Sequence, residues 1–154
     1  MTHTDKHQKP PEGFVKGPPR EPARRPSNRH SLSGLKDTDR GDPKGRNTMI
    51  APWVDVQADV DAINRGEGYC HRGTGRIWIN GRLYGTHNDR TTGTVYPIEG
   101  DGFVAISSAQ HYALRIYVRY NGPDTQAEHE LGMDPAISST DREVARRLWR
   151  MRAG

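Results

Sequence analysis

The sequence has a single cysteine and no long hydrophobic run, and each of these absences excludes a class of protein. Cys70 stands alone, so no disulfide can form within the chain, and a reducing, cytoplasmic setting fits best. No apolar stretch approaches the roughly 20 residues of a membrane span, and none follows the first lysines as a signal peptide would require. We expect a cytoplasmic protein without membrane contact; export by a route that needs no signal peptide stays open.

Hydrophobic residues make up only 32% of the chain, and they are scarcest in residues 1–48. This segment holds seven of the eleven prolines and carries eleven Lys+Arg against six Asp+Glu. It has too little apolar area to offset about 1–2 kcal/mol of backbone entropy per ordered residue. The composition predicts a disordered, basic, proline-rich tail over residues 1–48 and a single small α+β domain over residues 49–154. Whether the tail functions or is an upstream extension of a domain that starts at Met49 stays open.

The first part of the domain shows helix and hairpin patterns. An apolar face at helical spacing predicts a helix over about residues 54–65, and it comprises Trp53, Val56, Val60 and Ile63. Asn80-Gly81 lies between two β-favouring runs, which predicts a β-hairpin.

Two further strands are predicted over residues 94–98 and 103–106. Pro97 cannot donate a ladder hydrogen bond, so its strand is expected at an edge or at a bulge.

Three helices are predicted after the strands. Ser107 and Gln110 have capping-box spacing before a continuous apolar stripe, a short helix follows over residues 125–131, and Thr140 with Glu143 opens the last one. The strands and helices do not alternate, which argues against a parallel sheet. The predicted fold class is α+β, with a small antiparallel sheet of about four strands, an N-terminal helix and three C-terminal helices.

Histidines, a glutamate and arginines could supply acid–base chemistry. Metal-free RNA cleavage needs one group to take the 2′-hydroxyl proton, another to protonate the leaving oxygen, and a cation to stabilise the phosphorane. The candidate catalytic residues for such a ribonuclease are His87, His111, Glu99, Arg90 and Arg115. The alternative is that they are solvated surface residues, because nothing in their spacing forces them together.

Other chemistries find less support in the sequence. Cys70 and His71 with a further histidine lack the paired, closely spaced ligands of a zinc site, so no metal and no cofactor is expected. The pairs Gly66/Gly68 and Gly73/Gly75 do not open a helix after a strand, and we expect turns rather than a phosphate loop there.

The last helix carries a stripe of arginines that could follow a phosphate backbone. The candidate nucleic-acid-binding residues are Arg142, Arg146, Arg147 and Arg150, and the helix has few acids to balance them. A solvated face with Glu143 paired to Arg147 is the alternative. The basic segment at residues 20–29 could add non-specific binding or serve only as a solubilising linker.

Residues 125–133 resemble the first helix and turn of a helix-turn-helix motif, through Ala127, Leu131, Gly132 and Met133. The resemblance covers about twenty residues and implies DNA recognition by the second helix. It departs after the turn, where Pro135 delays that helix, Ile137 comes one place early and Asp141 replaces an apolar residue. A helical hairpin is the expectation that these departures favour.

The order of the elements also resembles that of small bacterial ribonuclease toxins, although those folds end in the sheet. No catalytic motif matches residue by residue, so the resemblance assigns no residue.

Three functions are therefore carried forward. The first is a small nucleic-acid- or acidic-partner-binding module of bacterial or phage type. The second is a metal-independent ribonuclease toxin, and the third is a non-catalytic adaptor that contacts a protein through Trp149 and Tyr112.

Overall fold

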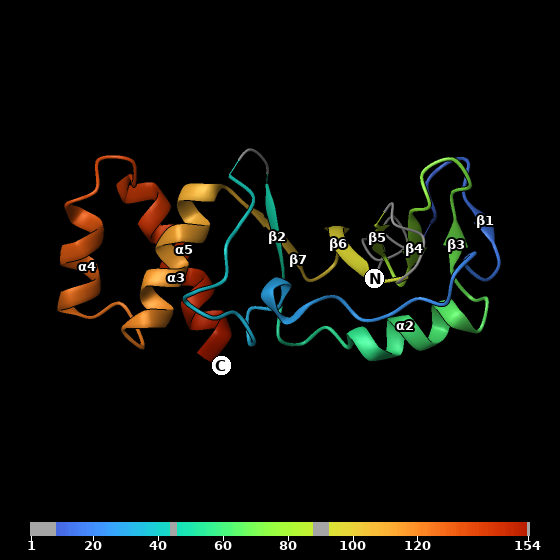
Figure 1. The fold of residues 1–154 in the computed structure, drawn as a ribbon, viewed down its shortest axis with the longest axis horizontal. Helices are drawn as coiled ribbons and strands as arrows, with labels where there is room; N and C mark the ends of the chain where they lie inside the picture. Colours follow the sequence, from blue (N-terminus) through green and yellow to red (C-terminus); the bar gives the residue numbers. More distant parts are fainter. Residues whose placement is uncertain (1–8, 44–45, 88–92, 154) are drawn as a thin grey trace. The chain divides into compact units, whose positions relative to one another are not determined.

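The computed structural model describes residues 9–43, 46–87 and 93–153, which form two compact units (Figure 1). The sheet unit consists of the described parts of Met1–Ser27 and Trp53–Phe103. The helical unit consists of those of Asn28–Pro52 and Val104–Gly154. Each unit thus combines an early and a late segment of the chain. The expected boundary between residues 48 and 49 falls inside a strand, β2 (Asn47–Ile50).

The sheet unit contains a five-stranded antiparallel sheet. Its strands, in spatial order, are β1 (Val15–Lys16), β3 (Tyr69–Cys70), β4 (Ile77–Ile79), β5 (Arg82–Thr86) and β6 (Val95–Gly100). The predicted hairpin is confirmed, because β4 and β5 flank Asn80 and Gly81, whose φ angles are 52° and 76°. The expectation for Pro97 is confirmed as well: β6 ends the strand order, and its pairing with β5 shifts register next to this proline.

Helix α2 (Val56–Asn64) packs against the sheet, in the place where the sequence predicts the first helix (Figure 1). The Asp55 side chain caps it by accepting a hydrogen bond of 2.9 Å from the Ala58 N–H. Val56, Val60 and Ile63 are buried as expected. Trp53 is 68% exposed, so its assignment to the apolar face is wrong: it precedes the first helical turn and does not follow the helix face.

A buried carboxylate fastens α2 to the hairpin. Asp59 is fully buried and accepts four hydrogen bonds, from Asn80 Nδ2 (2.8 Å), Arg82 Nε (2.7 Å), Arg82 Nη2 (2.9 Å) and the Tyr84 hydroxyl (2.5 Å). Burial and the Asp59 charge raise the pKa of Tyr84. Burial alone would lower the pKa of Arg82, but the hydrogen bond and the charge of Asp59 have the larger effect and raise this pKa. Both groups therefore stay protonated and keep donating to the carboxylate.

The described part of the helical unit contains three α-helices, the short 3-10 helix η1 (Asn28–His30) and a two-stranded sheet. Strand β2 pairs with β7 (Phe103–Ile106), and the helices are α3 (Ser108–Arg119), α4 (Thr125–Gly132) and α5 (Ser139–Ala153). The expectation of a single sheet of about four strands is therefore wrong in its pairing. The last predicted strand exists, but its partner β2 comes from the segment around the predicted boundary.

Two of the helix starts test the capping predictions. At α3, Ser107 and Gln110 form the predicted capping box. At α5, the Asp141 N–H donates to Ser138 Oγ and the Ser138 N–H donates to Asp141 Oδ2, both at 3.0 Å. The capping box therefore lies two residues before the predicted one at Thr140, because Asp141 is short enough to reach back.

The prediction of an unstructured tail does not extend to residues 9–43; residues 1–8 lie outside the described residues. Leu32 and Leu35 are at most 1% exposed and belong to the core of the helical unit. The Leu32 N–H donates to the Ile50 carbonyl at 3.0 Å, and Arg152 Nη1 donates to the carbonyls of Leu32 and Leu35. The segment is too poor in apolar residues to form its own core. It is ordered because its two leucines fill a core that α3 and α5 supply.

We expect Leu32→Ala to lower the free energy of unfolding by about 2–4 kcal/mol, because the change leaves a cavity in this core. Chemical denaturation of the full chain measures the loss. Ser33→Ala is the matched control, since Ser33 is exposed and its change should stay within about 0.5 kcal/mol. A Leu32→Ala protein as stable as the control would show that residues 28–43 do not belong to the core.

Candidate functional site

Helices α4 and α5 form the helical hairpin that the sequence predicts, joined by residues 133–138. Ala127, Leu131 and Ile137 are buried on the inner side of the hairpin. On α5, Ala145 and Leu148 are buried in the same core, which fixes the opposite side of this helix toward solvent. The outer side carries the arginines that the sequence singles out.

Glu128 on α4 holds two of these arginines. Arg146 Nε donates to Glu128 Oε2 at 2.7 Å, and Arg142 Nη1 lies 3.9 Å from Oε1 of the same carboxylate. The Tyr117 hydroxyl donates to Oε1 at 2.8 Å. Burial alone would raise the pKa of Glu128, but the hydrogen bonds from Arg146 and Tyr117 outweigh it and lower this pKa. Glu128 thus links α3, α4 and α5.

The other two arginines are more open. The side chains of Arg147 and Arg150 are 68% and 62% exposed, against 28% for Arg146 and 26% for Arg142. Within the described chain, the carboxylate that pairs with them is Glu143, at 3.7 and 4.0 Å, the outer range of an ion pair. The sequence indicates few balancing acids on α5 itself, but α4 supplies Glu128, which pairs with Arg142 and Arg146.

The structure places His111 in contact with Arg115. His111 is 3% exposed in the first turns of α3, and its Nδ1 accepts a hydrogen bond of 3.1 Å from Arg115 Nε. Burial, together with the Arg115 charge, lowers the pKa of His111 to about 4. His111 is therefore neutral at neutral pH, with its proton on Nε2.

The remaining candidates for acid–base chemistry belong to the sheet unit. His87 follows β5 and its ring packs 5.1 Å from the ring of Tyr96, whereas Glu99 is exposed on β6. Thr86 pairs with Val95 and Leu83 pairs with Glu99, so His87 and Glu99 lie at opposite ends of this strand pair, about 13 Å apart along the strand. Arg90 lies outside the described residues. Ribonuclease chemistry at these positions stays a prediction.

Neither the family models, nor the curated proteins, nor the solved structures gave a match. The function must therefore be argued from the residues themselves. Over the part of the chain that the structure describes, no group of three or more His, Cys, Asp or Glu side chains could hold a metal ion. No described helix combines the length and the apolar character needed to cross a membrane.

Cys70 and His71, where the sequence argues against a zinc site, have structural contacts. The Cys70 sulfur donates to the Gly17 carbonyl at 3.5 Å, and burial raises the pKa of this thiol, which disfavours the reactive thiolate. His71 Nδ1 accepts a hydrogen bond of 3.1 Å from the Thr74 N–H. Its ring also packs against Phe14, with 5.3 Å between the ring centroids.

The aromatic residues of the adaptor hypothesis are not free on the surface. Tyr112 and Trp149 are partly buried against the core of the helical unit. Arg115 and Arg152 lie over their rings, at 5.5 and 5.8 Å from the centroids. Much of the apolar surface of both side chains is thus already used within the unit.

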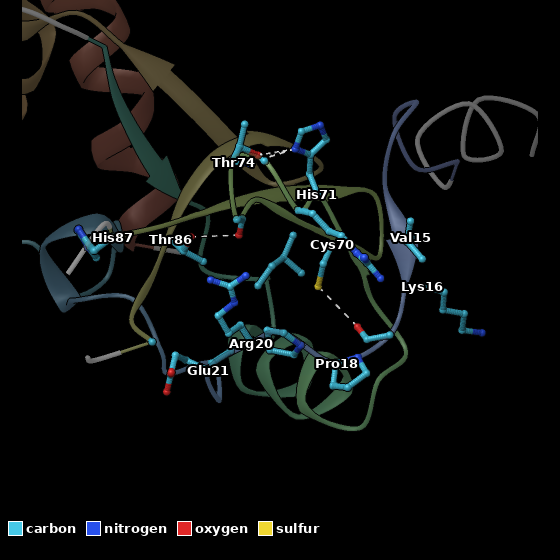
Figure 2. A pocket seen from close by; sticks show the side chains of 18 residues that line it. Val15, Lys16, Pro18, Arg20, Glu21, Cys70, His71, Thr74, Thr86 and His87 are labelled. Atoms are coloured by element: carbon cyan, nitrogen blue, oxygen red, sulfur yellow. Dashed lines mark hydrogen bonds between the residues drawn. The ribbon is translucent and has the colours of Figure 1, made fainter. Parts of the chain in front are cut away.

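A cavity of about 720 Å³, partly open to solvent, lies between the sheet and residues 17–24, which we call the strap (Figure 2). At one end of the strap the Gly17 N–H donates to the Gly68 carbonyl at 3.0 Å. At the other end, Ala23 exchanges two hydrogen bonds with the Asn64 side chain, at 2.8 and 3.0 Å. The strap therefore bridges one end of the sheet without filling the space beneath it.

Sequence reasoning missed this cavity. It grouped Arg20 with the other arginines of residues 20–29, but Arg20 lines the cavity and Arg24 pairs with Thr94 through its backbone. The signal that could have revealed the strap is Pro18-Pro19 followed by Pro22, a stiff spacing suited to a bridge. Nothing local identifies Asn64 as the residue that fastens it.

We expect acid to destabilise the helical unit through His111. The pKa of His111 is about 4 in the fold and about 6.5 when unfolded, so the unfolded chain binds more protons between these values. The stabilisation is complete above pH ~6.5 and is lost as the pH falls toward ~4, by about 3 kcal/mol at most. Denaturation of the wild type and of His111→Gln between about pH 4 and pH 6.5 gives the free energy of unfolding of each. The same pH dependence in both proteins would contradict the prediction.

Arg146 and Arg147 should differ in their effect on stability. Arg146→Gln breaks the 2.7 Å bond to Glu128 and should lower the free energy of unfolding by about 1 kcal/mol. Arg147→Gln removes the same charge from an exposed position and should change it by less than about 0.5 kcal/mol. Thermal or chemical denaturation of the two variants side by side tests the distinction, which equal losses would refute.

Proposed function

We propose that this protein binds nucleic acid, with Arg147 and Arg150 on α5 contacting phosphates. The observation that carries the proposal is the division of the four arginines into two held by Glu128 and two that remain more than 60% exposed. Arg147 and Arg150 are three residues apart, about 4.5 Å along the helix axis, so both project from one side of α5. Two guanidinium groups on one helix face suit neighbouring phosphate oxygens.

The charge of the helical unit supports the same proposal. Its two segments contain twelve Lys+Arg against nine Asp+Glu, whereas those of the sheet unit contain eleven against ten. Most of the excess positive charge of the chain therefore belongs to the unit that carries α5. An excess of this size favours weak, salt-dependent association with a polyanion over sequence recognition.

The fixed core behind α5 also favours a binding role. The Ser138–Asp141 capping box fixes the start of the helix, and Ala145 and Leu148 anchor its inner side. The exposed arginines thus project from a rigid element, which reduces the entropy lost when they contact phosphate. An acidic protein partner would use the same two side chains and is an outcome that the experiment must distinguish.

The experiment is fluorescence anisotropy with labelled duplex DNA and single-stranded RNA at several salt concentrations. Arg147→Gln with Arg150→Gln should weaken binding about tenfold and reduce the slope of log affinity against log salt by about two. Arg65→Gln with Arg76→Gln is the control, since it removes two exposed charges from the sheet unit and should change affinity far less.

Two results would reject the proposal. One is the absence of binding by the full chain at low salt, and the other is an equal loss of affinity in both double variants. Binding to an acidic polypeptide but to neither nucleic acid would assign the face to a protein partner instead. The folded state of each variant is checked by circular dichroism before binding is compared.

A further inference from the structure

The cavity under the strap is lined by more positive than negative charge. Lys16, Arg20 and Arg72 line it, and Glu21 is the carboxylate among its lining residues. Figure 2 shows Arg20 pointing up from the strap toward Thr86 on the sheet, whereas Lys16 and Glu21 point away from the cavity. Of the three charged residues labelled in Figure 2, Arg20 is the one that points into this space.

The guanidinium group of Arg20 has no internal acid to neutralise it among the residues that the structure describes. No carboxylate there lies within 4.0 Å of it, although Arg82, Arg119 and Arg146 all have such partners. Arg20 is exposed to solvent and points across the cavity without a counter-charge among the described residues, so it can meet an anion from outside.

The polar groups around Arg20 can complete an anion site. The Thr86 hydroxyl donates to the Gly75 carbonyl at 3.1 Å, so it has no donor left for the anion, but its oxygen can accept from a hydroxyl group of the ligand. His71 Nδ1 accepts from the Thr74 N–H, and the ring packs against Phe14 and points away from Arg20 in Figure 2, so His71 lies at the rim of the site. His87 and Arg72 line the same space from the sheet side and the loop side.

The cavity is also held open by its surroundings. Beyond the contacts at Gly17 and Ala23, the Arg24 N–H donates to the Gly93 carbonyl at 3.0 Å and the Val95 N–H donates to the Arg24 carbonyl at 3.1 Å. Gly93 has a φ of 66°, and the strap approaches it so closely that a side chain there would collide with the Pro22 carbonyl. A strap fixed at both ends with prolines between them loses little entropy when a ligand enters.

Size and donor arrangement select the chemical class of the ligand. A volume of about 720 Å³ lies within the range of small-molecule sites, roughly 300–1,000 Å³, and exceeds what an inorganic ion needs. A planar carboxylate is satisfied by one bidentate arginine, whereas a tetrahedral phosphate takes donors from several directions. Here Arg20 comes from the strap, Arg72 from the loop after β3 and His87 from the end of β5.

We propose that the cavity under the strap binds a small phosphorylated molecule of nucleotide size, with Arg20 as the principal phosphate ligand. The site is formed by the sheet unit alone and is independent of the arginines on α5. It uses no glycine-rich loop before a helix, so it differs from a phosphate loop. The apolar surface of the strap residues Pro18 and Pro19 can accept the non-phosphate part of the ligand.

The experiment titrates the full chain with AMP, inorganic phosphate, adenosine and succinate, and follows the backbone amide and histidine signals by NMR. AMP and phosphate should shift the signals of His71, Thr74 and Thr86, with AMP binding more tightly because it also fills the apolar part. Arg20→Gln should weaken AMP binding by about tenfold or more. Arg25→Gln removes an exposed charge from the adjoining segment outside the cavity lining and should leave AMP binding unchanged.

Three results would overturn the proposal. These are no binding of AMP or phosphate up to about 10 mM, equal binding of adenosine and AMP, and succinate binding as tight as that of phosphate. Equal effects of Arg20→Gln and Arg25→Gln would also reject it. The Arg147→Gln and Arg150→Gln double variant should bind AMP as the wild type does, so failure of the nucleic-acid proposal leaves this result unaffected.

Discussion

The carboxylate of Asp59 is the interaction on which the sheet unit depends. It brings Asn80, Arg82 and Tyr84 of the hairpin onto α2, in a place where an unpaired charge would be costly. The same helix carries Asn64, which fastens the strap. The cavity therefore exists because one helix is held to the hairpin by Asp59 at its middle and to the strap by Asn64 at its end.

The elements that the sequence predicts correctly are those whose signal is local. Asn80-Gly81 requires two positive φ angles in succession, and few structures other than a tight hairpin provide them. The box of Ser107 and Gln110 likewise joins residues three positions apart. Pro97 acts through a missing N–H, which restricts its strand wherever the rest of the chain lies. Each of these effects is decided within a few residues.

The elements that the sequence does not predict depend on distant partners. Leu32 and Leu35 are isolated in a polar segment, and their burial requires a core that forms from residues more than 70 positions later. In the same way, the sequence of β7 predicts a strand, but no residue near it identifies β2 as its partner. The same distinction applies to the candidate site. The exposure of Arg147 and Arg150 follows from helix periodicity. The ion pair of Arg146 with Glu128 and the position of Arg20 at the cavity depend on distant partners and do not.

The interleaving of the two units has a consequence for synthesis. Arg152 reaches back to the carbonyls of Leu32 and Leu35, across 120 and 117 positions in the chain. At about 5–20 residues per second, these leucines leave the ribosome on the order of ten seconds before α5 is made. The helical unit can close only after translation of α5, so its leucines remain available to chaperones and proteases throughout that interval. A high proportion of such long-range contacts also slows folding in general.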